Sequence, residues 1–197
     1  MKKLLLPRLF CAVAVISFSF APSAFAQEVV VNGGFETGSF PPWTEDDPSP
    51  FTNIGSDPLF AHSGTYHANL GADGTPRNLE QTLNTTPGVF YDLSFWLAND
   101  SGQPPNSFDV FWDGAPVMSL ANSPAFNYTL FSFSLQAVDS STILKFTYRH
   151  DDDFFRLDDV SAVPEPSVAW LVLPALGVLG LVKYRGTKHR RGLVVKA

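Results

Sequence analysis

The residues that could perform chemistry are three histidines and many carboxylates in the middle of this 197-residue chain. His62 and His67 flank a turn, and on a strand their odd spacing would point them to opposite faces, which is poor for joint metal binding; His150 is remote in sequence. The only cysteine, Cys11, lies near the N-terminus, and no Gly-x-Ser-x-Gly elbow occurs. No carboxylate spacing singles out an acid–base pair. We therefore expect no enzyme, although a catalytic site dispersed over a sheet stays open.

Two further motifs are weak. Asp151–Asp153 lacks the Asp-x-Asp-x-Asp-Gly spacing of a calcium loop, so we expect a solvated turn between a strand ending near Tyr148 and one beginning near Phe154. The pair Gly33-Gly34 is no nucleotide loop, because the third glycine is absent and no helix is predicted after it.

Two tryptophans are the candidates for stacking on a sugar ring. Trp43 lies in a proline-rich loop, with the rings of Phe51 and Phe60 in the loop region after it, and Trp96 lies on the polar face of its predicted strand. Nearby groups could accept hydrogen bonds from sugar hydroxyls: Asp109, Asn99 and Asn106. The alternative is that these rings close the ends of the domain as part of its core.

The elements that must position these residues are strands. Apolar and polar residues alternate over 91–97, 108–112, 131–135 and 144–148, and glycine and proline interrupt the chain frequently. No segment between them has a sustained helical period. One all-β domain over residues 27–162, a two-layer β-sandwich or jelly roll, is therefore predicted.

This domain is strongly acidic. Residues 27–162 contain four basic residues and 18 acids, a net charge of −14, whereas the whole chain has −6. Such a surface repels nucleic acid and anionic lipid and attracts divalent cations. We expect no nucleic-acid partner.

Both ends of the chain predict export. We expect residues 1–26 to be a signal peptide, because they combine Lys2 and Lys3, an apolar stretch and the small-x-small site Ala24-Phe25-Ala26. Signal peptidase is therefore an expected partner. In residues 163–197 we expect a motif at 163–166, a transmembrane helix at about 167–182 and a basic tail at 183–197. The cationic residues expected to stop the helix at the membrane are Lys183, Arg185, Arg190 and Arg191. As a helix, the segment from Val168 to Val182 would be only about 22 Å long, which is shorter than a hydrocarbon core of about 30 Å. It could serve as a temporary membrane anchor, and the alternative is a permanent but marginal one.

The C-terminal pattern resembles the PEP-CTERM sorting signal of Gram-negative, exopolysaccharide-producing bacteria, with recognition residues Pro164, Glu165 and Pro166. The resemblance implies processing by an exosortase, a membrane peptidase or transpeptidase. The protein would be held at the inner membrane first, and would then reach the cell surface, outer envelope or extracellular matrix.

Residues 29–162 resemble the galactose-binding-like jelly rolls, which include many carbohydrate-binding modules. The motifs that carry the resemblance are the Asn-Gly-Gly-Phe-Glu at 32–36, the Thr-Pro-Gly at 86–88 before a strand, and the Leu-Asp-Asp-Val at 157–160. It implies a polysaccharide ligand, and a structural Ca²⁺ held by Glu36 and Asp158 with backbone carbonyls. Alternatively, Glu36 caps a turn and Asp158 is a solvated acid. The other functions left open are a purely structural matrix protein cross-linked through Ca²⁺ and a hydrolase.

Overall fold

The computed structural model describes residues 27–46 and 50–165, and these contain eight strands and no helix. The strands are β1 (Thr44–Glu45), β2 (Thr52–Gly55), β3 (His67–Asn84), β4 (Phe90–Asn99), β5 (Asn106–Trp112), β6 (Ala115–Ala121), β7 (Phe126–Gln136) and β8 (Ser141–Pro164). The all-β class is confirmed, and the four alternating stretches lie in β4, β5, β7 and β8. The predicted signal peptide, the C-terminal membrane helix and the basic tail lie outside the described residues.

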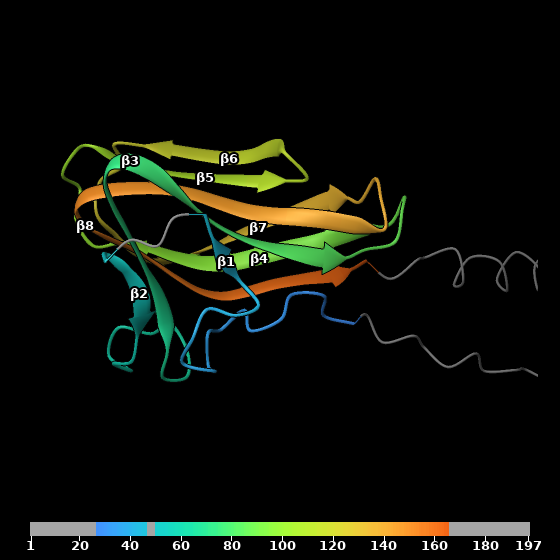
Figure 1. The fold of residues 1–197 in the computed structure, drawn as a ribbon, viewed down its shortest axis with the longest axis horizontal. Helices are drawn as coiled ribbons and strands as arrows, with labels where there is room; N and C mark the ends of the chain where they lie inside the picture. Colours follow the sequence, from blue (N-terminus) through green and yellow to red (C-terminus); the bar gives the residue numbers. More distant parts are fainter. Residues whose placement is uncertain (1–26, 47–49, 166–197) are drawn as a thin grey trace, which may run out of the picture.

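The long strands β3 and β8 each contribute to both layers of a sandwich (Figure 1). Residues 77–84 of β3 pair with 141–148 of β8, beside which lie β5 and then β6, with β1 on the opposite edge. We call this the β5 layer. Residues 68–70 of β3 pair with 155–157 of β8, beside which lie β4 and then β7, with β2 on the opposite edge. We call this the β4 layer. One continuous sheet thus folds over into a jelly-roll sandwich.

Aromatic rings fill the space between the layers. Phe95 of β4 contacts Phe146 of β8 edge-on at 5.4 Å, and Phe108 of β5 contacts Phe155 of β8 at 5.3 Å. All four rings are fully buried. Because successive residues of a strand point to opposite faces, burying these rings directs the intervening residues of β4 and β8 to the outer surface, where a site can form.

The predicted turn at Asp151–Asp153 is wrong, because β8 continues through these residues. The strand passes from one layer to the other here, opposite the register shifts of β3 between Leu70 and Arg77. The polar side chains serve this bend: the Arg149 guanidinium pairs with Asp151 at 2.7 Å, and the Asp153 amide donates to Nδ1 of His150 at 3.0 Å. The polar residues 151–153 mark the place where β8 passes between the layers. The backbone stays extended there because β8 pairs with other strands before and after these residues.

The described chain begins and ends at the same side of the domain (Figure 1). The Val29 amide donates to the Ala162 carbonyl at 3.0 Å. Val163 and Pro164 still pair with β4, and the Glu165 amide donates to the Phe90 carbonyl at 2.8 Å. The domain boundary expected after residue 162 therefore falls inside β8. No helix in residues 27–46 or 50–165 has the length and hydrophobicity needed to cross a membrane.

Candidate functional site

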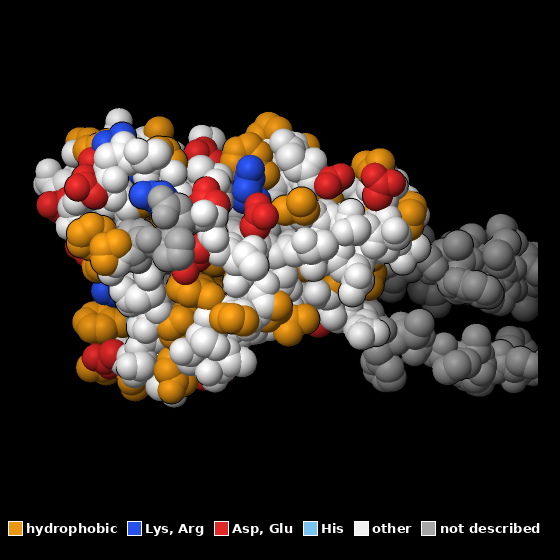
Figure 2. Space-filling view, in the orientation of Figure 1, with side chains coloured by type: hydrophobic (Ala, Val, Ile, Leu, Met, Phe, Trp, Pro, Cys, Tyr) orange, Lys and Arg blue, Asp and Glu red, His pale blue; other side chains and the backbone are white. Residues whose placement is uncertain are grey.

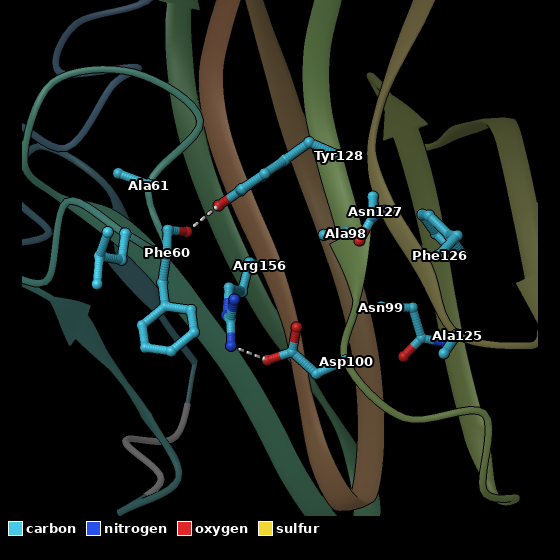
Figure 3. A pocket seen from close by; sticks show the side chains of 11 residues that line it. Phe60, Ala61, Ala98, Asn99, Asp100, Ala125, Phe126, Asn127, Tyr128 and Arg156 are labelled. Atoms are coloured by element: carbon cyan, nitrogen blue, oxygen red, sulfur yellow. Dashed lines mark hydrogen bonds and ion pairs between the residues drawn. The ribbon is translucent and has the colours of Figure 1, made fainter.

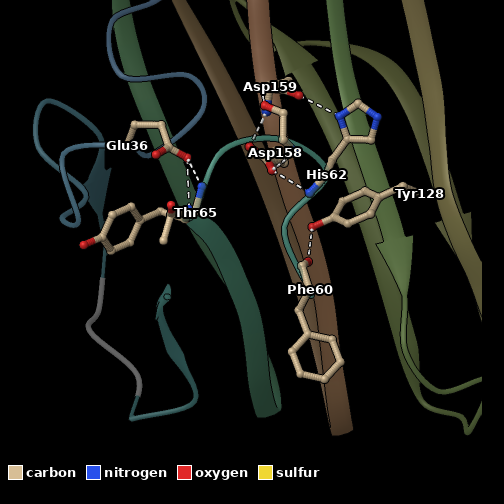
Figure 4. Close-up of polar contacts among 9 residues, drawn as sticks. Glu36, Phe60, His62, Thr65, Tyr128, Asp158 and Asp159 are labelled. Atoms are coloured by element: carbon tan, nitrogen blue, oxygen red, sulfur yellow. Dashed lines mark hydrogen bonds and ion pairs between the residues drawn. The ribbon is translucent and has the colours of Figure 1, made fainter. Parts of the chain in front are cut away.

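The loop 56–66, between β2 and β3, crosses the outer face of the β4 layer (Figure 4). Its His62 ring stacks on Trp96 at 3.8 Å, with 16° between the ring planes. The Tyr128 hydroxyl, from β7, donates to the Phe60 carbonyl at 3.0 Å, and the Phe60 ring lies 4.1 Å from the Arg156 guanidinium carbon. These contacts join the loop to β4, β7 and β8, so loop and sheet together form the walls of a site.

Two adjacent acids of β8 hold the middle of this loop. Asp158 is fully buried, and its Oδ2 accepts hydrogen bonds from the amides of His62 at 2.9 Å and Ser63 at 3.3 Å. Its neighbour Asp159 contacts the same two residues, with Oδ2 at 2.6 Å from Nδ1 of His62 and Oδ1 accepting from the Ser63 hydroxyl at 2.8 Å. Burial, and then the nearby Asp159 carboxylate, raise the pKa of Asp158 to about 6.

Glu36 holds the end of the same loop. Its Oε1 accepts hydrogen bonds from the Thr65 and Tyr66 amides at 2.9 and 3.0 Å. Gly64 has a φ of 62°, and a Cβ there would lie 2.2 Å from this oxygen, so only glycine fits the turn. Glu36 therefore does meet loop backbone, as the turn-capping alternative expected.

The Glu36, Asp158 and Asp159 side chains all approach Gly34. A Cβ added to Gly34 would lie 3.8 Å from both the Asp158 Oδ1 and the Glu36 Cγ. A buried carboxylate with a raised pKa, beside a second carboxylate, is an oxygen-rich setting that suits a hard cation. Within 27–46 and 50–165, however, no three His, Cys, Asp or Glu side chains are grouped to hold a metal ion. A Ca²⁺ here would need backbone carbonyls or water as further ligands.

An open pocket of about 530 Å³ lies on the outer face of the β4 layer (Figure 3). Arg156 occupies its floor, with its Nη2 2.5 Å from Oδ2 of Asp100. Phe60 forms one wall, and Phe126 and Tyr128 of β7 contribute the other rings. The pocket thus combines flat apolar surfaces with an ordered ion pair and the exposed amide of Asn127.

The prediction of Trp43 as a sugar-stacking residue is wrong. Trp43 is 2% exposed, and its ring lies 6.0 Å from that of Phe35 and 5.9 Å from that of Phe146. Its indole N–H donates to the Asn32 carbonyl at 3.1 Å. The alternative that the sequence left open, in which Trp43 is part of the core, is correct, because the proline-rich loop folds back over the end of the sandwich.

The predicted hydroxyl acceptors also do not form one site. Asn99 and Asn106 are buried, and both side-chain amides donate to the Ser123 carbonyl, at 3.1 and 3.2 Å. Asp109 points outward from the β5 layer, whereas Trp96 points outward from the β4 layer. Trp96 is half-buried, and it lines neither this pocket nor the smaller one beside it.

The pocket residues Tyr128 and Arg156 were not assigned a binding role from the sequence, whereas Phe60 was among the loop rings considered for stacking on a sugar. One signal was present for Arg156, which is one of only four basic residues between 27 and 162. An isolated cation on an acidic strand needs a partner, and Asp100 provides it. The acidic character of the domain is visible in Figure 2, where acidic side chains recur over the face shown and basic ones are few.

No protein-family model and no curated protein matches the chain. Among solved structures, it is similar to TmCBM61 in complex with β-1,4-galactotriose, with a TM-score of 0.59 and 18% identity over 71% of this chain and 100% of that one. It is similar to the CBM22-1–GH10 modules of Clostridium thermocellum xylanase 10B with xylohexaose (TM-score 0.54, 18% identity, 73% of this chain and 29% of that one). It is also similar to the CBM22-1 xylan-binding domain of Paenibacillus barcinonensis Xyn10C (0.51, 12%, 71% and 95%). At these identities the likeness establishes one thing: the chain has the jelly-roll fold that carbohydrate-binding modules use.

Proposed function

We propose that this chain is an exported, non-catalytic carbohydrate-binding protein of the bacterial envelope or extracellular matrix. The observation that carries the proposal is the 530 Å³ pocket on the β4 layer, with Phe60, Phe126 and Tyr128 around the Arg156–Asp100 pair. Aromatic rings accept the C–H face of a sugar, while the guanidinium, the carboxylate and Asn127 exchange hydrogen bonds with its hydroxyls. The fold shared with carbohydrate-binding modules supports this assignment.

Replacing Phe60 with alanine should weaken glycan binding about tenfold, because a contact ring at the centre of an interface contributes more than about 1 kcal/mol. The measurement is a glycan array with the full chain, followed by calorimetry on the glycan that binds. The panel should include β-1,4-galactotriose and xylohexaose, the ligands of two structures with this fold.

Phe90→Ala is the matched control. Phe90 is 44% exposed and Phe60 is 46% exposed, so each substitution removes a ring of similar exposure, but Phe90 lies at the start of β4 away from the pocket. Equal affinities for Phe60→Ala and the parent chain would show that the pocket is not the glycan site. If no glycan on the array binds, a purely structural matrix protein becomes the better-supported function.

The sorting proposal rests on the sequence of residues 163–197. We expect an exosortase to act near Pro164, Glu165 and Pro166, so that the surface form lacks the apolar segment at about 167–182 and the basic tail at 183–197. The intact mass of the surface form, measured in a host that carries the exosortase, checks this expectation. Pro166→Ala should leave the tail attached. A parent protein that reaches the surface with its full C-terminus would contradict exosortase processing.

Calcium is proposed as a structural ion beside Glu36 and Asp158. The support is that the Glu36 and Asp158 side chains both lie near Gly34, and that burial raises the pKa of Asp158. A cation would neutralise the Asp158 carboxylate and fix the loop 56–66 that forms the pocket wall.

A further inference from the structure

A second pocket, of about 280 Å³, lies beside the first on the same layer. Both are lined by Phe60, Asp100 and Arg156, so this trio separates them and belongs to each. A ligand with several linked units could therefore place one unit in each pocket while contacting the same three side chains.

The second pocket has an excess of negative charge. Asp57, Asp100 and Asp153 line it, against the single guanidinium of Arg156. Because Arg156 pairs with Asp100 at 2.5 Å, the charges of the other two acids are not balanced by that pair. Asp57 accepts a hydrogen bond from the Leu59 amide, and the Asp153 carboxylate makes no hydrogen bond or ion pair with the described residues. The pocket is therefore selective against anions and favourable to a cation.

An independent feature of the same wall is a buried histidine. His67 lines the pocket, is 2% exposed, and has no hydrogen-bond partner at its Nδ1. Burial, and then the nearby Arg156, lower the pKa of His67, so its ring is neutral at pH 7. A neutral ring adds no positive charge to this wall, so the excess of carboxylates in the pocket is not balanced by His67.

The remaining wall is apolar. Phe154 and Phe60 contribute rings to this pocket. A ring face attracts both the C–H face of a sugar and a cation. A ligand that fits this pocket should carry a positive charge and N–H donors for the carboxylates. It should also have an apolar face for the Phe60 and Phe154 rings.

We propose that the second pocket binds an amino-sugar unit with a free ammonium group, in a glycan whose adjoining unit occupies the first pocket. The proposal rests on the proposed carbohydrate-binding function. The three shared residues favour a glycan over the lysine of a protein partner, because linked sugar units continue directly from one pocket into the next. Uronic-acid glycans should be rejected by Asp57 and Asp153.

The test uses calorimetry with the full chain and two matched probes, the β-1,4-linked hexamers of glucosamine and of N-acetylglucosamine, which differ in the charged ammonium. We expect the glucosamine hexamer to bind at least tenfold more tightly at low salt, with the preference reduced by added salt. Asp153→Asn should reduce that preference about fivefold. Asp113→Asn, which makes the same change in the turn between β5 and β6, should leave it unchanged and so controls for overall charge.

The outcomes separate this inference from the proposed function. Binding of a neutral glycan with no preference for the glucosamine hexamer would overturn the amino-sugar proposal and leave the first pocket as a glycan site. If Asp113→Asn and Asp153→Asn reduce the preference for the glucosamine hexamer equally, the proposal is also overturned. The attraction would then come from the overall negative charge of the domain and not from the second pocket. A lysine tripeptide that displaces the hexamer at equal concentration would show that the pocket takes a protein cation instead. If no glycan binds at all, the proposed function falls as well.

Discussion

Replacing Trp43 with alanine should lower the free energy of unfolding by about 3–5 kcal/mol, the usual cost of removing a large buried aromatic side chain. Trp43 is 2% exposed, packs on Phe35 and Phe146, and satisfies the Asn32 carbonyl with its indole N–H. Its loss would leave a cavity between the layers and an unpaired carbonyl. Urea denaturation followed by circular dichroism measures the change.

Trp96→Ala is the comparison variant, because Trp96 is half-buried on the outer face and stacks only against the loop through His62. We expect it to cost about 1–2 kcal/mol, in line with a partly exposed ring contact. The opposite order of stabilities, or a Trp43→Ala variant that folds as stably as the parent but no longer binds glycan, would contradict the placement of Trp43 in the core.

Without calcium, the domain should lose about 2 kcal/mol of stability from Asp158 alone between pH 4 and pH 7, out of a total of about 3 kcal/mol. The folded state raises the pKa of Asp158 to about 6, from the ordinary aspartate value of 3.8. Well below pH 3.8 the carboxyl is protonated in both states, and its contribution to stability is complete. As the pH rises, the unfolded chain releases this proton first, so stability falls until the folded state also ionises near pH 6. A difference of about two pKa units corresponds to about 3 kcal/mol.

Unfolding free energies measured in EDTA from pH 4 to pH 7 test this pH dependence. Burial also raises the pKa of Asp100 and of Glu45, so the part due to Asp158 is the difference in slope between the parent chain and Asp158→Asn. Asp113→Asn serves as the charge control, and its slope should match the parent's. Equal slopes for Asp158→Asn and the parent would show that this carboxyl does not titrate abnormally.

Calcium should reverse the loss at pH 7. An ion that binds the folded state alone adds about 2.7 kcal/mol at a hundred times its Kd, which would raise the melting temperature by several degrees. Glu36→Gln should abolish most of that gain, since it removes one of the two carboxylates proposed to hold the ion. If calorimetry detects no heat and the melting temperature does not move with Ca²⁺, the calcium proposal is wrong.

Strand positions could be predicted because they depend on local alternation. Leu93, Phe95 and Leu97 repeat at every second position of β4, and all are fully buried. A one-residue change of register would expose all of them, so the pattern fixes both the strand and its inward face. The aromatic core follows from the same pattern.

The candidate site was predictable only in part. The resemblance identified Glu36 and Asp158, and the structure places both beside the loop 56–66. The pocket residues Phe60, Tyr128 and Arg156 come from a loop, β7 and β8, and nothing in the spacing of three distant segments indicates that they meet. Their contacts depend on which layer each strand joins, and that is decided by pairing across the whole sheet.

By itself, the sequence determined the all-β class, the inward faces of the strands and the strong negative charge of the domain, because each depends on composition or on the period of two. Only the tertiary structure decided which aromatic rings are core and which line a pocket. Trp43 and Phe60 both lie in irregular segments, yet one is buried and the other is 46% exposed. An irregular segment has no repeating geometry to set the direction of its side chains, so the surface it packs against determines their burial.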